Sequence, residues 1–518
     1  MSLTSTWYSS QRTAILLVLI LMLAGLTRIL SFSGYQGYDD GAYAELAHQM
    51  ANGEFKIGEY SGPPVFPLRV GLLAPVALCF KIAGTNELVM ILCPLAFSML
   101  FVVLVFVAGR VFFSERTGLI AAAIQAILPI DARLASILLP DVPAAFWACA
   151  GILLLYYSSN RATLASKTAY AVLSGFTFCL SWLFKESVVY LFPFIGIYMA
   201  WLIHRQKRNV VIIIGVGVTV ISVLILESLV YYKHTLDLLY RLHETERNYE
   251  FAKVRFFAEG SELGWTEGRY WFAVAKRVLI DGPRKIFINP NFGFVTVTAM
   301  LAIGYAALRK LRSFLVPGLW FLTLAFMFNF GSSSLQFYRP LVPFSRYLYL
   351  LLFPAVLLTA GLIDVLIPVR GLTRQEINRE RFFWGGTLAM GIILICLLGV
   401  YENIQEGIQS PVERTISHML APSDPIYTDP NTAFVLKFFW KYPKETQTWD
   451  FEGMKINNVP TGVYVLINQK RARFINSVYG YALPEFFEDI PKHWSLKWGG
   501  DRAELYWVPV ETTRILHK

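Results

Sequence analysis

The chain has 518 residues, of which 55% are hydrophobic and only 16% are charged, and its formal net charge is +10. Soluble globular proteins carry about 25% charged residues. This composition, with its many separate apolar runs, excludes an ordinary soluble protein and indicates a polytopic α-helical membrane protein. The basic residues lie in short clusters between the apolar runs, which is the pattern of membrane topology, so we expect no nucleic-acid partner.

Several long apolar runs are candidates for transmembrane helices, and we predict about eleven spans. The first run is too long for a cleavable signal peptide, so we expect it to remain as a signal anchor. A shorter apolar segment, residues 70–82, is expected to form a helix at the membrane interface. The predicted spans are residues 13–32, 87–109, 117–132, 141–158, 168–184, 187–203, 209–230, 290–309, 313–330, 346–369 and 384–401.

The loops between these runs predict the orientation of the chain. With a cytoplasmic N-terminus, every loop that falls inside is basic, whereas the short loops on the other side carry less excess positive charge. The positive-inside rule predicts this alternation for a cytoplasmic N-terminus and an outside C-terminus. Residues 33–86 and 231–289 then form long outer loops, and we expect the second to contain short amphipathic helices on the membrane surface.

Residues 402–518 differ in kind from the predicted transmembrane domain, residues 1–401, because they contain charges, turns and short β-branched runs. This pattern predicts a small extracytoplasmic α/β domain of about 100 residues, large enough for its own core. The predicted strands are residues 425–428, 462–467 and 504–508, and the predicted helix is residues 432–440.

Motifs for metal, disulfide or nucleotide chemistry are missing from the sequence. The five cysteines all lie in apolar stretches and none forms a CxxC pair, so we interpret them as small buried side chains. No histidine has a ligand spacing such as HExxH, and there is neither a phosphate-binding loop nor a nucleophile elbow. We therefore expect no nucleotide and no cofactor, and the sequence indicates no metal site.

Two adjacent carboxylates, Asp39 and Asp40, follow closely after the first apolar run. Charges at a membrane surface are costly unless they are used. A helix N-cap explains one of them, and a general base for an acceptor hydroxyl is the other interpretation. Asp141 begins the fourth predicted span on the same outer side, either as a cap or as a third carboxylate of one site. Asp131, at the end of the preceding span, is a weaker candidate.

Four cations fall outside, against the positive-inside trend: Arg69, Lys185, Arg339 and Arg346. Lys185 lies with Glu186 in a short turn between two apolar spans, where an ion pair or a lysine reaching to the interface is the simpler explanation. As a group, cations on this side need a partner, and a lipid phosphate is the natural one.

These residues together resemble the GT-C glycosyltransferases that use a lipid-linked sugar donor. The branch with the dolichyl-phosphate-mannose protein mannosyltransferases and the lipid A aminoarabinose transferase is the most similar. In that branch, an Asp followed by an acidic residue, a small residue and Tyr opens the first outer loop, as in residues 39–43 here. A second Asp followed by Pro starts the fourth span, here Asp141, and Arg346-Tyr347 and Lys185-Glu186 also match. The pair is Asp-Asp where many members have Asp-Glu, which leaves open which one is the base.

The resemblance implies an inverting sugar transfer at the outer membrane face, in a multi-pass protein of the bacterial inner membrane. The donor would be a polyprenyl-phosphate monosaccharide, and the acceptor a glycan, a lipid or a protein. It implies that a carboxylate takes the proton of the acceptor, and we predict Asp39 as this base, with Asp40 and Asp141 supporting it and orienting the acceptor. The phosphate of the leaving group would be held by cations. The candidates are Arg69, Lys185, Arg339 and Arg346 with Tyr347.

Two other classes of function stay open at this level. A polytopic transporter or lipid flippase would also explain many spans, but it predicts charges near the bilayer midplane and an internal repeat. A non-catalytic membrane scaffold would use the outer α/β domain to bind a partner. Charges at the ends of the runs and the lack of a repeat favour the transferase.

Overall fold

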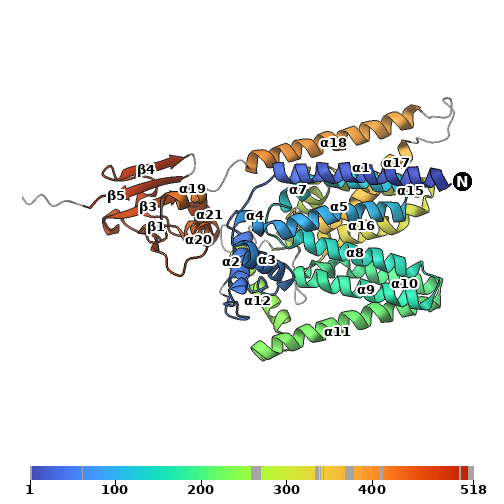
Figure 1. Ribbon diagram of the computed structural model, residues 1–518, viewed down its shortest axis with the longest axis horizontal. Coiled ribbons are helices and arrows are strands. Elements are labelled where there is room, and N and C mark those ends of the chain that lie inside the picture. Colours follow the sequence, from blue (N-terminus) through green and yellow to red (C-terminus); the bar gives the residue numbers. More distant parts are fainter. Residues whose placement is uncertain are drawn as a thin grey trace, which may run out of the picture.

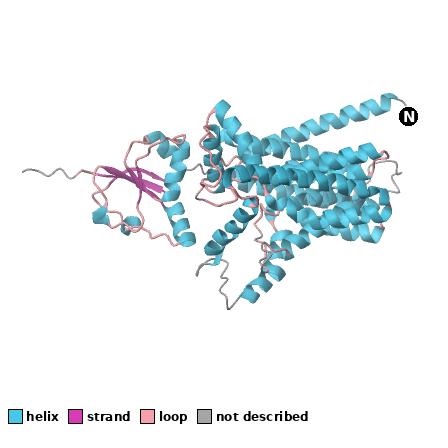
Figure 2. Cartoon of the chain, turned by 90° about the horizontal axis from the view of Figure 1, so that it is seen from below, coloured by secondary structure: helices cyan, strands magenta, loops and turns pink. Residues whose placement is uncertain are grey.

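The computed structural model describes residues 3–60, 62–257, 270–332, 338, 340–341, 344–367, 379–407, 412–500 and 503–510. Its main body is a bundle of long helices. A small domain with a five-stranded sheet lies at the end of the bundle opposite the N-terminus (Figure 1). Figure 2 shows the same two parts from a second direction, with helices beside the sheet of the small domain.

The bundle is built from helices whose apolar side chains cover most of their surface, as expected for segments that lie in lipid or in a buried core. Short 3-10 helices precede several of them. The helices of the bundle are α1 (Leu3–Leu30), α5 (Leu92–Phe112), α6 (Glu115–Ala126), the short α7 (Pro129–Leu134), α8 (Asp141–Ser159), α9 (Leu164–Phe184), α10 (Phe192–Arg205), α11 (Val210–Thr235), α15 (Val295–Arg309), α16 (Leu315–Phe330), α17 (Tyr349–Leu366) and α18 (Arg379–Gly407).

Among the described residues, eight helices are long and apolar enough to cross a membrane, by length and composition. They contain α1, α5, α8, α10, α11, α16, α17 and α18. The predicted spans 117–132, 168–184 and 290–309 correspond to helices outside these eight, namely α6 with α7, α9 and α15. The helices therefore occur where the sequence predicts them, and the number that crosses the membrane stays a prediction.

Helix α17 forms the centre of the bundle. Every residue from Tyr349 to Ile363 is buried, and the helix packs against α5, α6, α8, α15, α16 and α18. An apolar helix without a polar face is stable only when neighbours cover it on all sides, in protein or in lipid. The central position of α17 fixes the point where its preceding residues, Arg346 and Tyr347, emerge from the bundle.

Further helices connect the long ones, and two of them, α2 and α3, lie between the bundle and the small domain (Figure 1). A helix is present at the predicted position 70–82: it is α3, which packs against α2 and α9, whereas its placement at the membrane interface stays a prediction. The short helices predicted in the second long loop are also present, although residues 258–269 of that loop are outside the described residues. These elements are α2 (Asp39–Ala51), α3 (Val70–Ala83), α4 (Glu87–Met90), α12 (Tyr240–Phe257), α13 (Tyr270–Lys276), the π-helical turn Arg277–Asp281 and α14 (Gly282–Phe287).

The C-terminal domain is a three-layer α/β unit. Its sheet has the order β2-β1-β3-β5-β4, in which β2, β1 and β3 are parallel and β5 is antiparallel to β3 and β4. Side chains of β3 alternate between the two faces: Val465 and Ile467 join the core beside α21, whereas Leu466 joins the core beside α19 and α20. The elements are α19 (Val412–Met419), β1 (Ile426–Thr428), α20 (Pro430–Phe439), β2 (Thr448–Asp450), β3 (Val463–Asn468), α21 (Gln469–Tyr479), β4 (Ser495–Gly500) and β5 (Ala503–Val508).

The predicted strands and helix of this domain correspond to β1, β3, β5 and α20. Strands β2 and β4 were not predicted, because their residues are mostly exposed edge positions without an apolar alternation. Helix α18 continues to Gly407, beyond the predicted boundary at residue 401, so the helix is longer than its apolar run.

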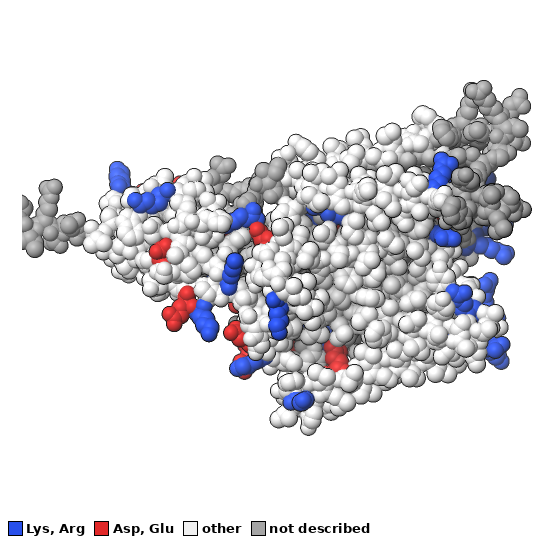
Figure 3. Space-filling view, in the orientation of Figure 1, with Lys and Arg blue, Asp and Glu red and all other residues white. Residues whose placement is uncertain are grey.

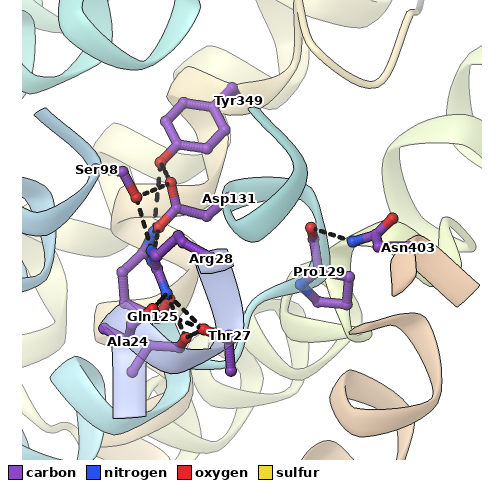
Figure 4. A network of polar contacts seen from close by, with 10 residues as sticks. Ala24, Thr27, Arg28, Ser98, Gln125, Pro129, Asp131, Tyr349 and Asn403 are labelled. Carbon is purple, nitrogen blue, oxygen red and sulfur yellow. Dashed lines mark hydrogen bonds and ion pairs between the residues drawn. The ribbon is translucent and has the colours of Figure 1, made fainter. Parts of the chain in front are cut away.

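A buried polar network ties five helices of the bundle together (Figure 4). Arg28 of α1 forms an ion pair with Asp131 of α7, and both side chains are almost fully buried. The Asp131 carboxylate also accepts hydrogen bonds from Ser98 at 3.1 Å, Gln125 at 2.9 Å and the hydroxyl of Tyr349 at 2.6 Å. Because every partner of Asp131 comes from the bundle core, its role is structural.

We expect Arg28→Met to destabilise the protein by about 3–5 kcal/mol, because it leaves the buried Asp131 carboxylate without its cation. Thermal unfolding in detergent measures the effect. The double variant Arg28→Met/Asp131→Asn removes the orphaned charge and should recover part of the loss. A single variant as stable as the wild type would show that the pair does not brace the bundle.

Candidate active site

The predicted site residues come together at the end of the bundle that faces the C-terminal domain. The elements that carry them are α2, the starts of α3, α8 and α17, and the end of α9. Figure 1 shows α2 and α3 between the bundle and the small domain. Each charge therefore lies at a helix end, where the sequence changes from apolar to polar and the backbone leaves the membrane-like core.

Asp39 forms an ion pair with Arg346, with 2.5 Å between Asp39 Oδ2 and Arg346 Nη2. Asp39 is the first residue of α2, and Arg346 lies just before α17. About a third of the Asp39 side chain is exposed, at 32%. The carboxylate is thus held in place by a cation and is also open to an incoming group.

A second ion pair joins Asp141, the first residue of α8, to Lys185 at the end of α9. Tyr347 lies between the two pairs: Lys185 Nζ is 4.3 Å and Arg346 Cζ is 5.1 Å from the centre of its ring. Cations over a tyrosine ring are attracted by its electron-rich face. Tyr347 therefore brings the two ion pairs into one cluster.

Arg69 completes this side of the site. Its guanidinium donates to the hydroxyl of Tyr43 and lies 3.5 Å from the Glu186 carboxylate. Arg69 also lies over the ring of Phe66, 5.3 Å from its centre. The side chain is mostly buried, so its charge acts at short range on neighbours in a medium of low polarity.

Two charged residues of this cluster, Arg241 and Glu227, were not predicted as site residues. Arg241 of α12 forms ion pairs with Glu186 at 3.0 Å and with Glu227 of α11 at 2.5 Å, and it donates to the carbonyl of Trp182 at 2.7 Å. The sequence signal was Glu227, a carboxylate inside the predicted span 209–230, which needs a cation close by. The arginine that pairs with Glu227 lies on a separate helix, α12, which follows the span.

Asp40 differs from Asp39 in its contacts. Its side chain is buried, with 1% exposed. Its carboxylate accepts the backbone N–H groups of Gln36 at 2.6 Å, Tyr38 at 2.9 Å and Gly37 at 3.4 Å. Asp40 therefore holds the turn before α2 in shape and has no open side for a reactant.

The two carboxyls have opposite pKa shifts. Burial alone would raise the pKa of Asp39, but Arg346, helped by Arg69 and Lys185, outweighs it and holds the pKa below its usual range. Burial raises the pKa of Asp40, despite the three backbone donors that favour its charged form. Asp39 is therefore ionised at neutral pH.

The helix-capping alternative does not describe these residues. Neither α2 nor α8 has a side-chain hydrogen bond at its N-cap, and the residues at those caps are Tyr38 and Pro140. Asp39 and Asp141 instead point their carboxylates to Arg346 and Lys185. Both still lie in the first turn of a helix, where the backbone dipole stabilises negative charge.

The remaining predictions for this site concern residues elsewhere in the chain. Arg339 lies outside the described residues, so its predicted role in phosphate binding stays a prediction. In the described part of the chain, no group of three or more His, Cys, Asp or Glu side chains could hold a metal ion. All five cysteines are free, and four of them are buried.

Comparison with known proteins identifies the fold. Residues 70–231 match the family described as dolichyl-phosphate-mannose-protein mannosyltransferase. No curated protein matches the chain. Among solved structures, ArnT from Cupriavidus metallidurans in the apo state has 14% identity and a TM-score of 0.51, over 98% of this chain and 98% of that one.

Two further structures share this fold. ArnT bound to undecaprenyl phosphate has 13% identity and a TM-score of 0.52, over 94% of this chain and 97% of that one. The oligosaccharyltransferase AglB from Archaeoglobus fulgidus, in complex with an inhibitory peptide and a dolichol-phosphate, has 14% identity and a TM-score of 0.55. That match covers 92% of this chain and 72% of AglB.

The chain is a multi-pass integral membrane protein with the GT-C fold. Its architecture is the predicted one, a helical membrane bundle with a small sheet domain near the C-terminus.

Replacement of Asp40 by Ala is expected to destabilise the protein by about 1–3 kcal/mol, because three backbone N–H groups of the turn lose their buried acceptor. Asp39→Ala should have a smaller effect, since its side chain is partly exposed. Thermal unfolding of the two variants in the same detergent compares them. Equal losses of stability would contradict the structural role of Asp40.

Proposed function

We propose that the protein is a glycosyltransferase that moves a monosaccharide from a polyprenyl-phosphate donor to a glycan, lipid or protein acceptor. The observation that carries the proposal is the cluster of two ion pairs around Tyr347, at the end of a membrane bundle. The family match over residues 70–231 and the GT-C fold support it. The structures with this fold include complexes with undecaprenyl phosphate and with a dolichol-phosphate.

Asp39 acts as the general base in this proposal. Its carboxylate is ionised, partly exposed and held by Arg346. It takes the proton of the acceptor hydroxyl while the hydroxyl oxygen bonds to the anomeric carbon of the sugar. The bond from that carbon to the phosphate oxygen breaks, and the electron pair leaves with the polyprenyl phosphate. A single displacement of this kind inverts the anomeric configuration.

Arg69, Lys185 and Arg346 stabilise the leaving phosphate, which gains negative charge in the transition state. Each already has a carboxylate partner at the site, Glu186, Asp141 and Asp39 respectively. The side chains are therefore close to their working positions before the donor binds, which reduces the cost of organising them. Since these cations neutralise the phosphate charge, we propose that transfer requires neither a nucleotide nor a metal.

The orientation of the chain in the membrane is part of the proposal. At the end of the molecule near the N-terminus, Figure 3 shows Lys and Arg side chains without acidic side chains among the coloured residues. The other end, with the C-terminal domain, shows both signs of charge. The positive-inside rule favours a cytoplasmic N-terminus, with the site at the outer face of a bacterial inner membrane.

A transporter is the weaker alternative. Transport proteins place their charged binding sites near the bilayer midplane, commonly on interrupted helices. The ion pairs of this site lie where α2, α8 and α17 begin, and this position at helix ends supports a site at the membrane edge. This position suits a reaction between a lipid headgroup and an acceptor at the surface.

Asp39→Asn is expected to lower kcat for sugar transfer by about 100- to 10,000-fold, the usual loss when a general base is removed. The amide keeps the size of the side chain but cannot take the proton. Transfer of label from a polyprenyl-phosphate sugar by the purified protein measures kcat. Glu59→Gln is the matched control, because Glu59 is an exposed carboxylate of the same loop paired with Lys56. Full turnover by the Asp39 variant would refute its assignment as base.

The pH dependence tests the role of Arg346. The pKa of Asp39 is below its usual range because Arg346 outweighs burial. The deprotonated base is thus lost only as the pH falls through this lowered pKa, and the acid limb of kcat/KM lies below the usual range of an aspartate. In Arg346→Gln, burial dominates, so the limb should move to higher pH. Lys56→Gln, in the exposed pair, is expected to leave it in place. An unmoved limb in the Arg346 variant would separate Asp39 from the measured pKa.

A further inference from the structure

The C-terminal domain lies directly on the turn that precedes Asp39. The ring of Tyr35 stacks on Phe438 of α20, with centres 3.9 Å apart and planes 7° apart. Gly37 has a φ of +75° and lies so close to α20 that an added Cβ would be 2.1 Å from Val435 Cγ2. No side chain fits between the turn and the domain at this point, so the two surfaces are complementary in shape.

Arg471 of α21 is the polar centre of this contact. Its Nε donates to Glu413 Oε1 at 2.5 Å and its Nη2 donates to the backbone carbonyl of Gln36 at 3.0 Å. The guanidinium carbon also lies 5.6 Å from the centre of the Tyr38 ring. Asn468 donates to the same Glu413 oxygen at 2.8 Å, which holds that carboxylate toward Arg471.

The charged side chains of this contact are almost completely buried. The side chains of Arg471 and Glu413 are 8% and 1% exposed. In the described part of the chain, Arg471 Nη1 has no hydrogen-bond partner, although it is buried. Burial of a guanidinium with an unpaired nitrogen costs free energy, because one N–H donor loses its water without gaining an acceptor. An apolar side chain of similar size would avoid this cost, so stability alone does not explain an arginine here. Its geometry suits a second task, which is to hold the carbonyl of Gln36.

The turn is therefore held from two sides. Asp40 accepts the N–H groups of residues 36, 37 and 38 from within the membrane domain. Arg471 donates to the carbonyl of residue 36 from the C-terminal domain. Asp39 follows this turn directly and begins α2. Its carboxylate is directed toward Arg346.

We propose that Arg471 is a positioning residue for Asp39, and that the C-terminal domain completes the active site through the chain Glu413, Arg471 and the carbonyl of Gln36. This inference rests on the proposed function for its effect on turnover, but the contact itself is testable without activity. Loss of the contact loosens the turn, and a general base that is displaced by about 1 Å can lose two orders of magnitude in rate.

The test compares Arg471→Met with Arg473→Met in the full-length protein in detergent. Arg473 lies on the same helix and forms an exposed ion pair with Glu488 at 3.0 Å, so it is the matched control. For Arg471→Met we expect kcat to fall by about 10- to 100-fold with little change in the donor KM. Hydrogen exchange of a peptide that covers residues 34–41 should become faster. The control should match the wild type in both measurements.

Arg471→Lys distinguishes loss of the contact with the turn from general unfolding of the C-terminal domain. Lysine keeps a cation beside Glu413 but lacks the planar fork that reaches two acceptors, so the domain should stay folded while the turn loosens. Exchange of strand β3 reports whether the domain is intact. If both Arg471 variants keep β3 protected and leave kcat and the exchange of residues 34–41 at wild-type values, the positioning role is wrong. If the wild type transfers no sugar, the proposed function fails, and the exchange of residues 34–41 still decides whether Arg471 holds the turn.

Discussion

The ion pair between Asp39 and Arg346 is the interaction on which the proposed site depends. The two residues are far apart in sequence, and each lies next to a segment that is buried in the bundle or in lipid. A charge in such surroundings is costly without an opposite charge nearby. The requirement for pairing brings the start of α2 to the start of α17, and the pair Asp141–Lys185 follows the same rule beside it.

This pairing links donor binding to the strength of the base. A donor phosphate that binds Arg346 competes with Asp39 for the same guanidinium. As that attraction weakens, the effect of burial on Asp39 becomes dominant and its pKa rises. Under the proposed mechanism, the carboxylate thus becomes a stronger base when the donor phosphate is bound. In the proposed reaction, the arrangement of charges that stabilises the empty site also prepares it for proton transfer.

Each partner of the ion pair has its own structural support. The turn before Asp39 is held by Asp40 and, from the C-terminal domain, by Arg471. The start of α17 is held by the hydroxyl of Tyr349, which donates to the buried Asp131. These supports come from different parts of the chain, but the turn and the start of α17 each depend on an almost fully buried carboxylate, Asp40 and Asp131 respectively. Buried, fully bonded groups of this kind restrict the positions of the reactive side chains that follow them.

The sequence by itself determined the membrane class, the positions of the helices and most of the charged residues of the candidate site. Apolar runs and charges at their ends are local signals, so they can be identified without knowing how the helices pack. The tertiary structure decided which charges meet. The sequence does not distinguish Asp39 from Asp40, because they are the same residue type at adjacent positions. In the structure Asp39 faces Arg346, whereas Asp40 faces the backbone of its own turn. Arg241 and Arg471 come from an amphipathic helix and from the α/β domain, and their contacts depend on distances that no sequence spacing encodes.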